Sequence, residues 1–346
     1  MADNSAKRIE LGFLTNGAFS DAASGGAAEG HKDVVDLFRI AEQMGYQRGW
    51  LRNRHFDNYV ASPLPLLAAA SQVTTKIKLG TAIIPVGYEH PIRLAEDAAT
   101  VDLLADGRLE LGLAGGIPTF QSIFHPNEGP WEEASQGRVS EFLAALAGKV
   151  YGTSPAGDDY VVRPKGVGLL DRVWYGPGSV ATATRTAEQG MDLLLSAIGP
   201  NMGLSFEEAQ LAQIQAHRTA WTRNDRRPRV SAARLFFPAL NDSQRGLYQA
   251  FSDLRASGGP AAARPQGALN PTDRPPQANR AGPGLMSPVF VGDPAEVIAY
   301  LKADVAVAEA GELMIFLPPN FTHRENVTLL EAIATHVAPA LGWSPA

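Results

Sequence analysis

The sequence predicts an α/β fold in which eight strands alternate with helices, the arrangement of a TIM (β/α)8 barrel. Short apolar runs of strand length recur along the 346 residues, and amphipathic helical patterns separate them. Most runs are nearly continuous in apolar residues, which is typical of parallel strands buried on both faces. The chain is long enough for eight βα units with insertions. A doubly wound open sheet is the alternative, and eight strands fit it less well.

The clearest unit runs from Ile77 to Gly116. An apolar strand over 77–86 leads into a helix with Pro91 at its first position, where the missing N–H of proline costs little. A second apolar strand follows and ends on Gly115-Gly116, where a ligand could approach the backbone. These residues therefore predict a βαβ unit.

The other elements continue the alternation. The expected strands cover residues 9–15, 47–51, 77–86, 109–114, 172–175, 191–196, 229–237 and 313–317. The expected helices cover residues 33–44, 63–73, 91–105, 133–147, 180–189, 206–221, 243–255, 293–308 and 326–337. Ser62 and Asp293 stand where helix N-caps are expected. Arg234 interrupts the apolar pattern of the seventh strand.

Insertions are expected after strand four and between strands seven and eight of one domain spanning 1–346. Residues 117–134 form an irregular loop, and 149–170 resemble a hairpin. Residues 256–288 hold seven prolines and five glycines without periodicity. A segment of this length is expected to be a mobile lid or a disordered insertion.

Composition narrows the functional classes. A net charge of −6 without a concentrated basic stripe argues against a nucleic-acid partner. The absence of cysteine excludes disulfides, thiolate metal sites and cysteine nucleophiles. No apolar run approaches the roughly 18 residues of a membrane helix, and the first residues lack an apolar signal core. We therefore expect a cytoplasmic protein with no membrane partner and no protein-built metal site.

In a TIM barrel the active site lies at the carboxyl ends of the strands. This rule marks a set of residues as lining the mouth of the barrel: Asn16, 52–55, 81–86, 115–116, 176–179, 196–201 and 318–320.

The turn Gly176-Pro177-Gly178-Ser179 opens a helix that contains Thr182. A small-residue turn at a helix start exposes backbone N–H groups at the positive end of the helix dipole, which suits a phosphate. A plain strand-to-helix turn capped by Ser179 is the alternative.

The end of the second strand carries Asn53, Arg54 and His55. His55 is the candidate acid or base, since histidine exchanges protons near neutral pH, although it could simply hydrogen-bond a neighbouring loop. Other polar and aromatic residues are assigned structural roles: His90 as a helix cap, His217, His336 and Arg138 as helix surface residues, and Phe124 and Trp131 as loop packing. His125 could face either the pocket or solvent.

Several short motifs follow one another in a fixed order. They are Ser62-Pro63, Leu67 to Ala70, Thr74, Ile77 to Ala82, His90 to Asp97, Leu103, Gly107-Arg108, Val173 to Ser179, Val291 to Pro294 and Val297. Together they resemble the bacterial luciferase-like, flavin-dependent monooxygenases, over roughly residues 8–255 and 288–342.

The resemblance implies a TIM barrel that binds FMN at the strand ends, with reduced FMN supplied by a separate flavin reductase. Molecular oxygen would then give a flavin C4a-(hydro)peroxide that oxidises a small organic substrate, while the protein excludes water. It also implies a homodimer.

By position, the resemblance assigns the flavin phosphate to Gly178, Ser179 and Thr182, together with Arg138. Tyr175 belongs to the same motif. The resemblance also implies a non-proline cis peptide under the flavin ring, which corresponds here to Thr81-Ala82.

Two positions depart from the pattern of the family. Where Glu-His-His-Phe is typical, this chain has Asn53-Arg54-His55-Phe56, so Arg54 replaces the catalytic histidine. A guanidinium is no base near neutral pH, although Arg54 could bind an anionic substrate or stabilise a peroxide anion. An arginine that often contacts the phosphate is Gly115 here. A deazaflavin-dependent oxidoreductase and a non-catalytic flavin-binding protein are therefore kept as alternatives.

Overall fold

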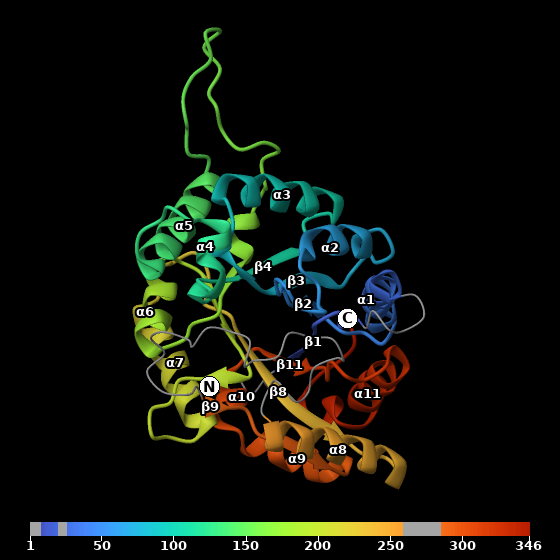
Figure 1. Cartoon of the computed structure of the whole chain (residues 1–346). Helices are drawn as coiled ribbons and strands as arrows, with labels where there is room; N and C mark the ends of the chain where they lie inside the picture. The colour runs from blue at the N-terminus through green and yellow to red at the C-terminus, as the bar shows by residue number, and fades with distance from the viewer. Residues whose placement is uncertain (1–7, 20–25, 259–284) are drawn as a thin grey trace.

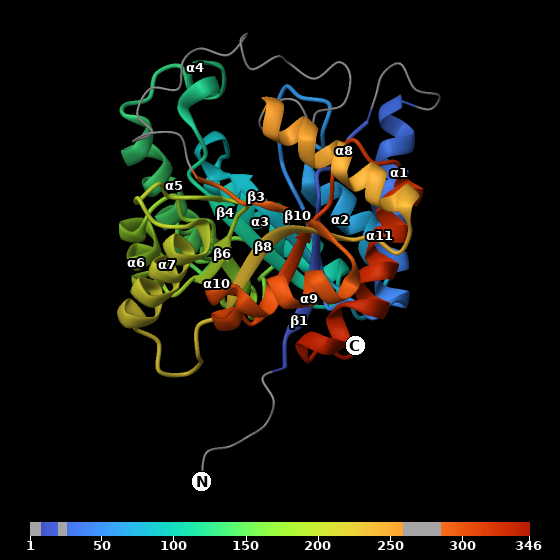
Figure 2. The ribbon, with the colours of Figure 1, turned by 90° about the horizontal axis from the view of Figure 1, so that it is seen from below.

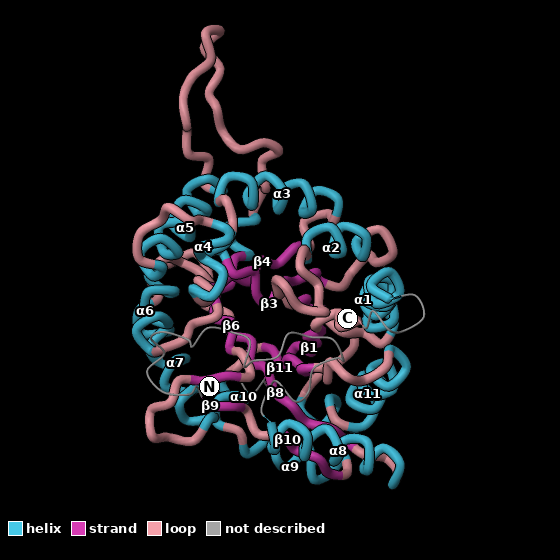
Figure 3. Tube along the Cα trace, viewed as in Figure 1, coloured by secondary structure: helices cyan, strands magenta, loops and turns pink. Residues whose placement is uncertain are grey.

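Eight parallel strands close into a barrel at the centre of the molecule (Figure 1, Figure 3). The computed structural model describes residues 8–19, 26–258 and 285–346. The barrel strands are β1 (Glu10–Thr15), β2 (Arg48–Leu51), β3 (Lys78–Pro85), β4 (Leu109–Ala114), β5 (Val173–Tyr175), β6 (Asp192–Leu195), β8 (Val230–Pro238) and β11 (Glu312–Phe316). Each pairs with two others of the eight, since β1 pairs with β11 and β6 with β8. The predicted barrel is confirmed, and the open sheet is ruled out.

Helices surround the barrel. They are α1 (Gly26–Gln43), α2 (Pro63–Ser71), α3 (Pro91–Leu104), α5 (Trp131–Leu146), α6 (Val180–Glu188), α7 (Phe206–Ala220), α8 (Asp242–Gly258), α9 (Pro294–Ala303), α10 (Val305–Glu309) and α11 (His323–His336). Asp293 caps α9 in a capping box and His90 caps α3, as predicted. Ser62 occupies the N-cap position of α2, but its hydroxyl makes no capping bond. Within the described ranges, no helix combines the length and apolar character needed to cross a membrane.

The structure contains three short strands that were not predicted. Strand β10 (Val289–Gly292) adds to β8, and β7 (Ile198–Gly199) pairs antiparallel with β9 (Leu285–Met286). The segment 256–288, predicted to be structureless, therefore has ordered ends: residue 256 lies in α8, and β9 lies near the other end. The expected lid itself, over residues 259–284, lies outside the described residues.

One predicted helix is divided in two at Asp304. The Asp304 carboxylate accepts the backbone N–H groups of Ala306 and Val307 at 2.9 Å and thereby starts α10. The same carboxylate receives the buried Arg234 guanidinium at 3.0 Å. The arginine that interrupts β8 is thus neutralised inside the fold.

Two inserted segments lie outside the barrel. The loop after β4 contains a 3-10 turn, η2 (Pro118–Phe120), and the short helix α4 (Gln121–Phe124). Residues 149–168 extend outward as an arm (Figure 1), closed by an antiparallel bridge between Thr153 and Asp159. Figure 2 shows α4 and α8 at the same end of the barrel, opposite the start of β1.

His217 was predicted to be a surface residue, and this is wrong. Its side chain is fully buried on α7, and its Nε2 donates to the carbonyl of Met191 at 2.9 Å. The buried face of α7 also carries Gln210 and Gln213, so the polarity of its residues did not show which face of the predicted helix is buried. Burial lowers the pKa of His217, because it removes the charged imidazolium from water. Its Nδ1 has no hydrogen-bond partner among the described residues.

The barrel interior is filled by two tryptophans. The rings of Trp50 and Trp174 meet edge to face, with centroids 5.6 Å apart. The Trp50 indole donates to Glu312 at 2.7 Å, and the Trp174 indole donates to Glu110. A side chain on Gly80 would overlap the Trp50 ring, so glycine leaves the space that this ring fills.

The packing around Trp50 gives a stability prediction. We expect Gly80→Ala to lower the free energy of unfolding by about 1–3 kcal/mol, as overpacking of a rigid core does. Gly246→Ala is the control, because no atom lies within 4 Å of the added carbon on α8. Urea unfolding followed by circular dichroism compares the two, and equal stabilities would contradict the account of the barrel interior.

His217 gives a pH prediction. The unfolded chain binds a proton on this residue more readily than the folded chain, so stability falls as the pH drops below about 6.5. Between that pH and the lowered pKa of His217 in the folded chain, the free energy of unfolding falls by up to ~1.4 kcal/mol per pH unit. His217→Gln keeps a donor for Met191 and should flatten this decline, whereas His336→Gln, on an exposed residue of α11, should not. Equal slopes in both variants, measured by urea unfolding, would refute the assignment.

Candidate active site

The residues that follow β2, β3, β4 and β5 meet at the carboxyl end of the barrel, as expected for this fold. Asn53 is buried there, and its Nδ2 donates to the carbonyl of Ala61 at 2.7 Å. Its Oδ1 is buried without a hydrogen-bond partner in the described part of the chain. One acceptor atom therefore remains unsatisfied inside the mouth.

Arg54 forms an ion pair. Its Nη2 lies 2.9 Å from a carboxylate oxygen of Asp57, whose side chain is fully buried. The guanidinium also lies over the ring of Tyr59, 5.5 Å from the centroid. Asp57 thus balances the charge of the residue that replaces the histidine of the family.

His55 lies among aromatic rings. Its ring centroid is 4.8 Å from that of Phe124 and 5.4 Å from that of Tyr88. Its Nε2 is buried without a hydrogen-bond partner among the described residues. Burial lowers the pKa of His55, so the imidazole is neutral at pH 7. It can therefore offer one hydrogen bond to a ligand, either as donor or as acceptor.

Strand β3 carries the expected bulge, where the pairing with β4 shifts between Thr81 and Ile84. The cis peptide joins Ala82 to Ile83, so the prediction of Thr81-Ala82 is wrong by one bond. Thr81 still pairs with Leu111, and only the two residues after it leave the ladder. Thr81 is fully buried, and its hydroxyl both donates to and accepts from the backbone of Gly112.

The end of β4 contacts the end of β5. The Gly115 N–H donates to the hydroxyl of Tyr175 at 2.9 Å. A Cβ on Gly115 would lie 3.1 Å from the Ser135 hydroxyl and 3.5 Å from that of Tyr175. The hydroxyls of Ser135 on α5 and Tyr175 on β5 therefore crowd the position of the first side-chain carbon that any larger residue at position 115 would add.

The turn between β5 and α6 is open on one side. No atom lies within 4 Å of a Cβ built on Gly178. Ser179 is the N-cap of α6 and accepts the Thr182 N–H at 3.1 Å, as predicted for a strand-to-helix turn capped by Ser179. The hydroxyls of Ser179 and Thr182 lie 2.9 Å apart. Two hydroxyls thus stand beside an uncovered glycine at the positive end of a helix.

Arg138 is buried and does not remain on the helix surface. Its side chain is 9% exposed, and its Nη2 forms an ion pair with Glu128. It lines a cavity of about 360 Å3 together with His90 and His125. Among the described residues, no hydrogen bond or ion pair joins Arg138 to the β5–α6 turn, and its Nη1 is buried without a hydrogen-bond partner.

Arg185 is a cation that the sequence analysis did not identify. It follows Thr182 by three residues on α6, so the two side chains are neighbours on the helix surface. Its guanidinium forms no ion pair within the described ranges. Burial raises the pKa of Tyr175, and the charge of Arg185 opposes part of this rise. Arg185 therefore lies within electrostatic reach of the hydroxyl that binds Gly115.

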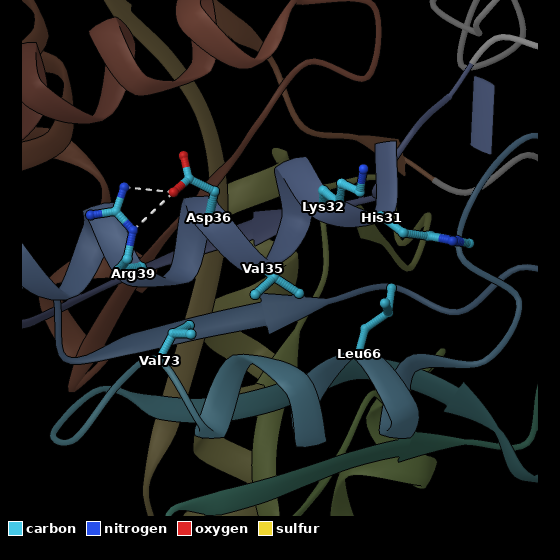
Figure 4. Close-up of a pocket in the computed structure, with 7 residues that line it drawn as sticks. All are labelled: His31, Lys32, Val35, Asp36, Arg39, Leu66 and Val73. Atoms are coloured by element: carbon cyan, nitrogen blue, oxygen red, sulfur yellow. Dashed lines mark hydrogen bonds and ion pairs between the residues drawn. The ribbon is translucent and has the colours of Figure 1, made fainter. Parts of the chain in front are cut away.

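Another hollow, of about 320 Å3, lies between α1 and α2 (Figure 4). Val35, Leu66 and Val73 line it, and Asp36 binds Arg39 at 2.6 Å at its edge. It contains none of the predicted site residues. In the described part of the chain, no three His, Asp or Glu residues are grouped as metal ligands.

The chain matches the family model described as luciferase-like monooxygenase over residues 9–309. It is 32% identical over 119 residues to the oxygenase component of flavin-dependent trigonelline monooxygenase from Acinetobacter baylyi, covering 34% of this chain and 32% of that protein. It is 35% identical over 88 residues to the alkanal monooxygenase alpha chain of Photorhabdus laumondii, covering 25% and 24%. These matches span about a third or less of each relative.

Solved structures share the whole fold. The chain superposes on the oxygenating constituent of 3,6-diketocamphane monooxygenase from Pseudomonas putida, in complex with FMN, with a TM-score of 0.68. That match covers 96% of this chain and 98% of the other at 14% identity. An F420-dependent secondary alcohol dehydrogenase gives the same TM-score, with 96% and 99% covered at 13% identity. The match over residues 9–309 shows that this chain belongs to the luciferase-like monooxygenase family, and the barrel agrees with it.

Proposed function

We propose that this protein is an FMN-dependent monooxygenase that oxidises a small organic substrate with reduced FMN supplied by a separate reductase. The β5–α6 turn, with its open glycine and paired hydroxyls, is the observation that carries the proposal. The relative from Acinetobacter baylyi is named as an oxygenase component, which supports a partner reductase. The Pseudomonas putida structure that shares the fold holds FMN, which supports the cofactor.

The residues of the turn fit a phosphate. Gly178 leaves the approach to the backbone uncovered, and of the Ser179 and Thr182 hydroxyls, which share one hydrogen bond, one keeps its O–H to donate to a phosphate oxygen. The start of α6 adds the partial positive charge of the helix dipole. These groups would hold the phosphate of FMN, while Ala82 and Ile83 at the β3 bulge would lie against its ring.

We assign the cationic contact to Arg185. The family arginine is missing at Gly115, and Arg138 has its Nη2 on Glu128, with its Nη1 buried and without a partner in the described residues. Arg185 projects from the helix that begins at the turn, and long helical side chains lean toward the helix start. Its charge would thus compensate for the one missing at position 115.

When bound, reduced FMN would activate molecular oxygen, and the chain would supply the surroundings for that chemistry. The rings around His55 would exclude water from the reacting atoms. The neutral imidazole of His55 would hold or pass a proton at Nε2. Because Asp57 balances the charge of Arg54, Arg54 would position the β2 loop without acting as a base.

A deazaflavin-dependent oxidoreductase is the second candidate. The F420-dependent alcohol dehydrogenase has the same fold, and Arg54 in place of the family histidine fits either chemistry.

Equilibrium binding followed by rapid mixing with oxygen separates these functions. We expect reduced FMN to bind at least about tenfold more tightly than reduced F420, a difference of ~1.4 kcal/mol. We also expect a transient absorbance during the reoxidation of bound FMN that reoxidation in buffer does not show. Tighter binding of F420 would favour the deazaflavin enzyme. FMN binding with unaltered reoxidation would contradict the monooxygenase and favour a flavin-binding protein.

A further inference from the structure

Six ring-bearing side chains from separate loops meet at one side of the barrel mouth. We call them the mouth aromatic cluster: His55, Phe56, Tyr88, Phe120, Phe124 and Trp131. They come from the segments that follow β2, β3 and β4 and from the first residue of α5. The predicted loop packing of Phe124 and Trp131 is thus part of a larger assembly.

The rings of the cluster contact one another closely. Tyr88 stacks on Phe124 with centroids 4.9 Å apart, and it lies 5.0 Å from Trp131. Phe56 meets Phe120 edge to face at 4.8 Å. The Tyr88 hydroxyl donates to the carbonyl of Ile117, which ties the segment after β3 to the one after β4. These contacts therefore fix the positions of the rings, whose faces and edges are available to a ligand.

Two members of the cluster are unsuited to a purely structural role. Phe56 has a φ of 55°, a backbone region that bulky side chains seldom occupy, and the residue is 48% exposed. Such outliers concentrate at functional sites. His55 has a buried Nε2 without a partner in the described residues. A ligand that covered Phe56 and bonded to this nitrogen would satisfy both.

The charge of Arg54, next to the cluster in the chain, is already paired. The guanidinium of Arg54 is bound to Asp57 at 2.9 Å, so the cation expected to receive an anionic substrate is balanced. Aromatic rings offer electron-rich faces, which repel a carboxylate and attract the edge of another ring.

We propose that the mouth aromatic cluster recognises the substrate and selects uncharged, planar aromatic compounds that carry one hydrogen-bonding oxygen or nitrogen. The ring of such a compound packs on Phe56 and Phe124, and its polar atom bonds to His55 Nε2. This inference rests on the proposed function, because it assigns a substrate class to the same mouth.

Three probes of similar size test the class: 2-naphthol, its saturated analogue decahydro-2-naphthol, and the anion 2-naphthoate. Binding to the full-length protein is measured by calorimetry, with and without oxidised FMN. We expect 2-naphthol to bind at least about tenfold more tightly than either analogue, from several ring contacts that each contribute a few-fold. Equal or tighter binding of 2-naphthoate, or of the saturated compound, would overturn the proposal.

Variants locate the site. Phe56→Leu and Phe124→Leu should each weaken 2-naphthol binding about three- to tenfold, and His55→Phe should abolish the preference for 2-naphthol over naphthalene. Ile123→Ala is the control, since Ile123 lies on α4 and is 62% exposed. FMN affinity should stay within about twofold in all four, which also verifies folding. Unchanged 2-naphthol binding in both Phe variants, or parallel loss of FMN and 2-naphthol, would overturn the proposal.

The two proposals fail separately. Binding of 2-naphthol at the cluster by a protein that does not bind FMN would reject the proposed function and keep the aromatic site. Binding of FMN without selective binding of 2-naphthol would reject the aromatic site and keep the proposed function.

Discussion

The contact between Trp50 and Trp174 inside the barrel is the constraint on which the rest of the structure depends. Each indole needs a buried acceptor, and Glu312 and Glu110 supply one each. Arg48 lies 3.2 Å from Glu312, and Arg229 lies 3.2 Å from Glu110, so each buried carboxylate has a cation beside it. The interior is thus packed rather than open, and ligand chemistry is directed to the strand ends.

That end of the barrel has two chemically different sides. The segments after β2, β3 and β4 contribute rings around His55. The ends of β4 and β5 and the start of α6 contribute hydroxyls, an open glycine and Arg185. A flavin with its phosphate at α6 would place its ring toward the aromatic side, next to the β3 bulge. Cofactor and substrate would then meet beside the mouth aromatic cluster.

Elements whose signals are local could be predicted from the sequence. The strands are dense apolar runs, and Ser179 and Asp293 cap helices through bonds that span three residues. The missed features depend on contacts that the chain order does not show. Arg138 was predicted to be exposed because its partner Glu128 lies in an irregular loop, whose contacts the sequence pattern does not indicate. His217 looked exposed because its acceptor is a backbone carbonyl, which leaves no mark in the sequence. The cis bond lies one residue further along β3 than the resemblance implied, within the bulge between Thr81 and Ile84.

The central claim is that the start of α6, with Arg185, holds the flavin phosphate. Its most direct test is the ratio of FMN affinity to riboflavin affinity, since the two differ only in the phosphate. We expect Arg185→Gln to lower this ratio at least about tenfold, as loss of a charged hydrogen bond of ~1.5–3 kcal/mol implies. Arg138→Gln should leave it nearly unchanged. A ratio that survives Arg185→Gln and collapses in Arg138→Gln would contradict the account and move the phosphate to the cavity beside Glu128.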